Sequence, residues 1–175
     1  MRAWILLLLI LPLFPRAARA QDDDEDTPLQ RYLVHVQLGD GLERVRRVYP
    51  PAQEWPATVE PRTGVTRYTV QRGTAKAFPS KIETLYLGFK KGVLVEIEIV
   101  YDEKESRVLT VGKTAGDYAL VYGEARRSGD LFFWSDGRTV LRVFPAEVPI
   151  AQDGEHAVAW RTAVQVFDKG LFKAD

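Results

Sequence analysis

Apolar and polar residues alternate most regularly between Val93 and Tyr101, where the sequence reads VLVEIEIVY. Successive side chains of a strand point to opposite faces, so Ile97 and Ile99 share one face while Glu96 and Glu98 share the other. β-branched residues dominate the first set, as a packed, pleated surface favours. The pattern predicts an antiparallel strand with one buried face and one face in water.

The same reasoning predicts two helices. Asp40 is placed to cap a short helix that ends before Pro50, because the apolar residues from 42 to 49 then share one face. A second helix is expected over the second half of 106–122, ending near Gly123. The expected strands cover residues 32–38, 66–71, 83–101 (a hairpin that turns at 90–92), 131–135, 138–144 and 158–166. Loops are expected at 53–64 and 145–155, and a charged turn at 102–106.

The Asp136-Gly137 pair lies between two apolar runs and is a strong hairpin signal. A two-residue turn there would place Trp134 opposite Thr139. It would also place Phe132 opposite Leu141.

Together these elements predict an α+β fold: an antiparallel sheet with two helices packed on one face. Residues 32–175 are expected to form one domain, a normal length for a single core. Residues 33–101 and 107–168 both read as a helix followed by antiparallel strands. We therefore expect a degenerate tandem repeat.

The first twenty residues read as a cleaved secretory signal. An apolar run from Trp4 to Phe14 follows Arg2, and Ala18-Arg19-Ala20 offers the small residues that a signal peptidase recognises. The run is shorter than the about 20 residues of a spanning helix. We expect the mature chain to begin at Gln21, to carry no stable membrane anchor and to reside in the bacterial periplasm, with full secretion as the alternative.

Charge and cysteine content narrow the function further. Residues 21–31 open with a block of five acidic residues and are expected to be a disordered lead-in. Without the three Arg of the signal, 21 basic residues face 24 acidic ones, so nucleic acid is not the expected partner. The chain has no cysteine, which excludes disulfides, thiol catalysis and thiolate metal sites.

The search for catalytic or metal-binding motifs identifies no residue with a catalytic or metal-binding role. Asp153, Glu155 and His156 could hold a metal, but three polar residues in an exposed loop rarely do. Glu96 and Glu98 lie close enough on one strand face for a carboxylate pair. Their expected role is to keep that face wet. No cofactor is expected.

Candidate binding residues lie near the first helix. Arg44 and Arg47 are placed on its outer face, where they could contact an acidic partner or remain solvated. Trp55 follows in a polar, proline-rich stretch and could line a binding surface. Trp134 and Trp160, which lie on alternating strands, are expected in the core.

The run LGDGLERVRRVYP from Leu38 to Pro50 resembles the opening of BamE-type envelope proteins. The later runs LGFKKGVLVEIEIVY and FFWSDGRTVLRVF are similar to the strand and turn patterns of small periplasmic proteins. This resemblance implies a helix-plus-sheet module, like that of BamE and the tandem β-lactamase inhibitor proteins, which binds other proteins and has no catalytic residues. The chain lacks the lipid-anchor cysteine and the cysteine pairs of those families. Outer-membrane anchoring and enzyme inhibition are therefore not implied.

We therefore expect a non-catalytic protein-interaction module whose partner is another protein of the cell envelope. The alternative is a binder of a small molecule, lipid or peptide on the concave face of the sheet. An enzyme is the third possibility.

Overall fold

The structure is a computed structural model that describes residues 27–152 and 155–172, without the side chains of 151–156. The expected signal peptide and residues 21–26 of the acidic lead-in lie outside the described residues. The rest of the expected lead-in is held by the fold, because Leu29 is buried and Arg31 pairs with Asp168 at 2.7 Å. The side chains of Asp153, Glu155 and His156, which the sequence analysis considered as possible metal ligands, also lie outside the described residues.

The described residues form ten strands and three helices. The first half contains β1 (Tyr32–Leu33), β2 (Val36–Gln37), α1 (Leu42–Val48), β3 (Ala57–Glu60), β4 (Val65–Gln71), β5 (Ile82–Lys90) and β6 (Val93–Tyr101). The second half contains α2 (Glu103–Val108), α3 (Val111–Tyr122), β7 (Arg126–Ser128), β8 (Leu131–Ser135), β9 (Thr139–Gln152) and β10 (Glu155–Asp168). The α+β character and the antiparallel sheet that the sequence predicts are confirmed.

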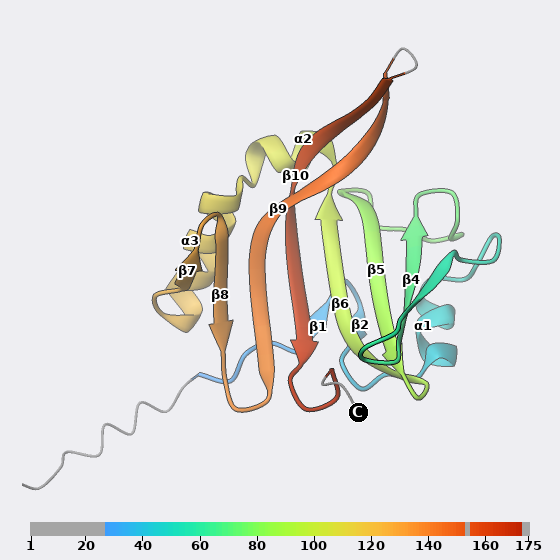
Figure 1. Cartoon of the computed structure of the whole chain (residues 1–175), viewed down its shortest axis with the longest axis horizontal. Helices are drawn as coiled ribbons and strands as arrows, with labels where there is room; N and C mark the ends of the chain where they lie inside the picture. Colours follow the sequence, from blue (N-terminus) through green and yellow to red (C-terminus); the bar gives the residue numbers. More distant parts are fainter. Residues whose placement is uncertain (1–26, 153–154, 173–175) are drawn as a thin grey trace, which may run out of the picture.

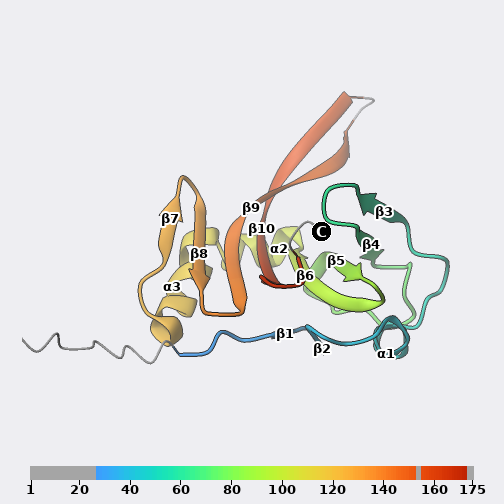
Figure 2. The ribbon, with the colours of Figure 1, turned by 60° about the horizontal axis from the view of Figure 1, so that its bottom comes forward.

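Eight of the strands form one antiparallel sheet in the order β3-β4-β5-β6-β10-β9-β8-β7. The order is mirrored about its centre, because the last strand of each half lies innermost and the two pair with each other (Figure 1). β1 and β2 form a separate two-stranded hairpin. Figure 2 shows this hairpin and α1 on one side of the sheet, while β3 and β4 curl toward the other side.

Two rows of apolar side chains cross six strands and form the centre of the core. One row runs Tyr68, Leu87, Ile97, Val166, Leu141 and Trp134, and the next runs Val70, Leu85, Ile99, Val164, Val143 and Phe132. Val45 of α1, the α1 C-cap residue Tyr49 and Ala115 of α3 are buried in the same cluster. Each fully buried aliphatic side chain contributes about 1.5–3 kcal/mol to folding.

A register shift at the start of β6 changes which residues enter this core. Glu96 lies opposite Gly88, but Leu94 rather than Val95 lies opposite Phe89, so one residue of β6 is extra. Leu94 therefore joins Ile97 in the core cluster, a place that uninterrupted alternation assigns to Val95.

The prediction of a wet face on β6 is wrong. Glu96 and Glu98 are only 3% and 7% exposed. β6 lies at the centre of the sheet between β5 and β10, so side chains from both neighbours cover its second face.

The hairpin between β8 and β9 has a longer loop than predicted. Trp134 lies opposite Leu141 rather than Thr139. The carboxylate of Asp136 accepts hydrogen bonds from the N–H groups of Arg138 and Thr139 at 2.7 and 2.6 Å. It therefore holds a three-residue loop, which shifts the pairing by two positions.

The helices also differ from prediction. Gly41 rather than Asp40 is the N-cap of α1, and Asp40 instead pairs with Arg44 at 2.8 Å. The expected charged turn at 102–106 contains α2, whose first turn is capped by the Asp102 side chain. α3 ends at Gly123 as predicted, but it begins early in the region, after its N-cap Thr110.

Two stretches that the sequence predicts as loops contain strands. β3 lies within 53–64, and β9 continues through the expected loop after residue 144. Prolines and polar residues masked the alternation in both places. Among the described residues, no helix is long and apolar enough to cross a membrane.

Gly88 and Gly116 give opposite predictions for substitution by alanine. A Cβ atom at Gly88 would lie 2.7 Å from Glu96 Oε2 and 2.9 Å from Glu96 Cβ, whereas one at Gly116 meets nothing within 4 Å. We expect G88A to lower the free energy of unfolding by about 1–3 kcal/mol. G116A, in the middle of α3, should raise it by about 0.5–1 kcal/mol. Urea denaturation of both variants tests this, and a neutral G88A would contradict the close contact.

Candidate functional site

The hairpin formed by β9 and β10 projects from the sheet as an arm, made of the last part of β9 and the first part of β10. β9 and β10 pair with each other over their full fourteen residues, but β8 pairs with β9 only up to Val143 and β6 pairs with β10 only from Ala163 onward. Residues 145–152 and 155–162, which we call the arm, therefore pair with no other described strand of the sheet (Figure 1).

The arm exposes apolar side chains to solvent. Trp160 is 59% exposed and Val158 is 53% exposed, and both lie on the same face of the arm. The expectation that Trp160 packs in the core is therefore wrong, whereas Trp134 is buried as predicted. An isolated two-stranded hairpin is only marginally stable in water, so an exposed apolar arm suits contact with another molecule.

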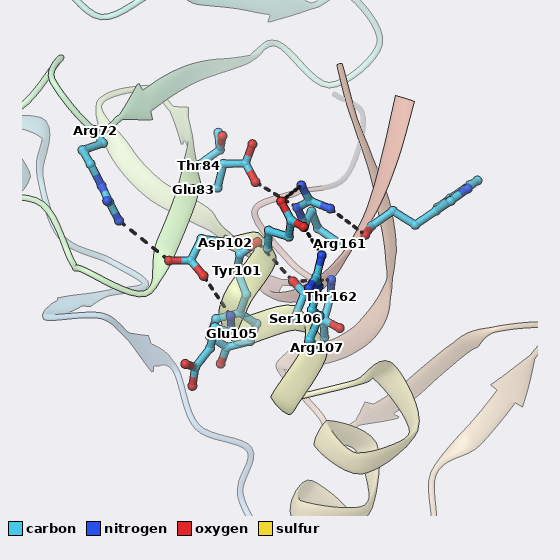
Figure 3. A network of polar contacts seen from close by, with 12 residues as sticks. Arg72, Glu83, Thr84, Tyr101, Asp102, Glu105, Ser106, Arg107, Arg161 and Thr162 are labelled. Carbon is cyan, nitrogen blue, oxygen red and sulfur yellow. Dashed lines mark hydrogen bonds and ion pairs between the residues drawn. The ribbon is translucent and has the colours of Figure 1, made fainter. Parts of the chain in front are cut away.

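A polar network holds the base of the arm against α2 (Figure 3). Arg161 contacts Glu83 of β5 at 3.2 Å and Glu103 of α2 at 3.6 Å. Ser106 Oγ donates to the carbonyl of Tyr101 and accepts from the backbone N–H of Thr162 at 3.1 Å. Since β5, α2 and β10 all contribute, the network fixes the direction in which the arm leaves the sheet.

The predicted binding residues are not gathered at one surface. Arg44 is exposed on α1 and paired with Asp40, and Arg47 is also exposed on α1. Trp55 is only 2% exposed: it packs edge-on against Tyr68, and its indole N–H donates to the carbonyl of Thr74. A partner can reach the α1 arginines, but it cannot reach this buried indole.

The face of the sheet opposite the apolar rows carries a cluster of charged and polar groups. Arg67 Nη2 lies 2.5 Å from Glu98 Oε2 and 3.6 Å from Glu96 Oε1. Gln165 Nε2 bridges the two carboxylates, at 2.6 Å from Glu96 and 3.1 Å from Glu98. Arg142 Nη1 donates to the side-chain amide oxygen of Gln165, Oε1, at 3.4 Å. The two carboxylates thus lie beside each other, and both are bound by the same arginine and the same glutamine.

Burial dominates the electrostatics of this cluster. It raises the pKa of Glu96 and of Glu98 above the ordinary glutamate value, and the nearby Arg67 only partly offsets the effect. Burial also lowers the pKa of Arg142, against the opposing influence of the two carboxylates. Paired acids with raised pKa values occur at catalytic sites. Here the carboxylate oxygens contact protein groups, which indicates a structural role.

The functional residues that the sequence did not reveal are those of the arm. Val158 and Trp160 were assigned to a strand, but the partner strand was read as a loop because Pro145 and Pro149 interrupt it. The alternation of Val148 and Ile150, one on each side of Pro149, was the available signal. It becomes informative only when the stretch is aligned against the strand that follows.

Comparison of the chain with models of known protein families, with curated proteins and with solved structures found no match.

The carboxylate cluster gives a prediction for pH. The pKa of Glu98 is higher in the folded than in the unfolded chain, so its contribution to stability is complete below the unfolded-state value. That contribution is lost as the pH rises through the folded-state value. We expect E98Q to gain stability relative to the unmodified protein between pH 4.5 and pH 8. Urea midpoints across this range measure the difference, and a difference that is constant or shrinks with rising pH would oppose it.

The network at the arm base gives a second prediction. S106A removes the acceptor of the Thr162 N–H, so we expect a loss of about 0.5–1.5 kcal/mol in unfolding free energy. Amide hydrogen exchange at Thr162 should also become faster. Ser128, exposed on β7, provides the control, because S128A should change neither quantity. Unchanged exchange at Thr162 in S106A would show that another group protects this amide.

Proposed function

We propose that this chain is a non-catalytic protein-interaction module and that the arm is its main contact element. The observation that carries the proposal is the exposure of Trp160 and Val158 on a hairpin that the rest of the sheet does not cover. Tryptophan is among the residues most enriched at the energetic centres of protein interfaces. A rigid base at α2 supports such a role, because a preorganised arm loses less entropy on binding.

The partner is proposed to be another protein of the bacterial cell envelope. The apolar run from Trp4 to Phe14 and the sites at Ala18 and Ala20 support export to the periplasm, with secretion as the alternative. The resemblance to BamE-type proteins agrees with this proposal. α1 and α3 are proposed to cover the same face of the sheet, as two related helices of a degenerate repeat.

A membrane is a less suitable target for the arm. The sequence that links the two strands of the arm is QDGEH, and Glu147 adds another acid to the arm. Insertion of these charges into a bilayer is costly, and anionic lipid headgroups would repel them.

A second candidate function is the binding of a small molecule, lipid or peptide on the face that carries the carboxylate cluster. Arg67 stacks over the ring of Tyr86 at 4.3 Å, and Arg142 stacks over Phe167 at 4.6 Å. These flat, partly exposed pairs would suit an anionic or aromatic ligand.

The test is chemical crosslinking of the mature chain, residues 21–175, in envelope extract, followed by affinity capture and mass spectrometry. We expect one stoichiometric protein, and W160S should weaken its capture by more than tenfold, as for a hot-spot residue. Leu120, 87% exposed on α3, gives the matched control, because L120S removes an even more exposed apolar side chain elsewhere.

Charge reversal at Arg44 and Arg47 tests whether α1 adds a second contact. Capture of nothing above background, or equal losses in W160S and L120S, would count against the arm as the contact element. Retention of a small ligand in native mass spectra would then favour the second candidate.

A further inference from the structure

The two outer edges of the arm differ. Thr162 donates its backbone N–H to Ser106 Oγ and not to β9, so this N–H points toward the β6 side of the arm. Backbone groups alternate in direction along a strand, and hence those of Trp160 and Val158 point to the same side. β6 ends at Tyr101 and pairs with β10 only from Ala163 onward, so no described strand lies beside this part of β10.

The β9 edge is blocked by prolines. Pro145 lies opposite Thr162 and Pro149 lies opposite Val158, so both occupy outward-facing positions on β9. Proline has no N–H to donate, and natural proteins use it to protect exposed strand edges from pairing. The arm therefore protects the β9 edge and leaves part of the β10 edge open. On that edge Arg161 Nη1 donates to the carbonyl of Trp160 at 3.3 Å, but the N–H groups of Trp160 and Val158 point outward.

The open edge has an apolar face that an added strand would extend. Trp160 and Val158 lie on that face, while the small residues Ala157 and Ala159 lie on the opposite one. Side chains of neighbouring strands contact directly across the pair. A matching segment therefore has a large apolar side chain at every second position.

The base of the open edge is already paired within the chain. Arg161 Nη1 donates to the carbonyl of Trp160 at 3.3 Å, and Ser106 Oγ accepts from the N–H of Thr162. The charges beside this base also balance, because Glu83, Asp102 and Glu103 pair with Arg161, Arg72 and Arg107. An added strand would therefore pair beyond the base, at Trp160 and Val158.

We propose that the β10 edge of the arm binds an extended segment of a second protein by strand addition, in line with β6. The segment is apolar at alternate positions and pairs with the outward-facing backbone groups of Val158 and Trp160. This inference rests on the proposed function and specifies its mode: backbone hydrogen bonds supply affinity, and the Trp160 face supplies selectivity.

The test uses a library of random heptapeptides displayed on phage, selected against the mature chain. We expect enrichment of peptides with large apolar residues at alternate positions. Val158 provides the decisive variants, because its N–H points outward and Pro149 already occupies the opposite position. V158P should weaken a selected peptide by about tenfold or more, and V158A by less than about threefold.

Two controls separate edge pairing from damage to the arm. The N–H of Ala159 points toward β9, so A159P should disrupt the arm itself, whereas V158P should keep the amide spectrum of the folded arm. Equal binding to V158P and V158A would overturn strand addition and leave side-chain contact through Trp160 intact.

Failure to enrich any peptide would overturn the proposed segment. Native mass spectrometry tests the remaining occupant: a dimer that V158P abolishes would assign the edge to a second copy of this chain.

Discussion

The pairing of β6 with β10 is the interaction on which the rest of the structure depends. Each half of the chain supplies a meander of four strands, and these two strands join the halves into one sheet. Only this pairing makes the two apolar rows continuous across six strands. Without it, each half would offer four strands and a small core of its own, and a core of that size stabilises a fold only marginally.

The same pairing explains why charged residues are buried at the centre of the molecule. An innermost strand has covered faces on both sides, so the polar side of β6 requires partners within the protein. Gln165 on β10 and Arg67 on β4 provide them for Glu96 and Glu98. Gly88 on β5 leaves the space in which the Glu96 side chain lies. The result is a specific register, because a shift by one residue would separate the carboxylates from these partners.

The sequence predicted the fold class and the elements with strong local patterns, such as β6, α1 and the C-terminal end of α3. It failed where tertiary contacts determine burial and strand register. The burial of Glu96 depends on the position of β6 in the sheet, which no local pattern contains. The bulge near Val95 and the loop held by Asp136 each move the register through single contacts. The arm was missed because prolines that protect an edge resemble prolines that end a strand.

The central place of β10 also affects the order in which the chain can fold. β10 is the last strand to leave the ribosome, yet it contributes to the middle of the sheet and brings Gln165 to the carboxylates. A nascent chain that stops before residue 155 has an open edge on β6 and two acidic side chains without their amide partner. The complete sheet therefore has to wait for β10, since contacts between distant segments form late. Until β10 has been made, the edge of β6 can pair with another chain, so the incomplete polypeptide is the form most exposed to aggregation.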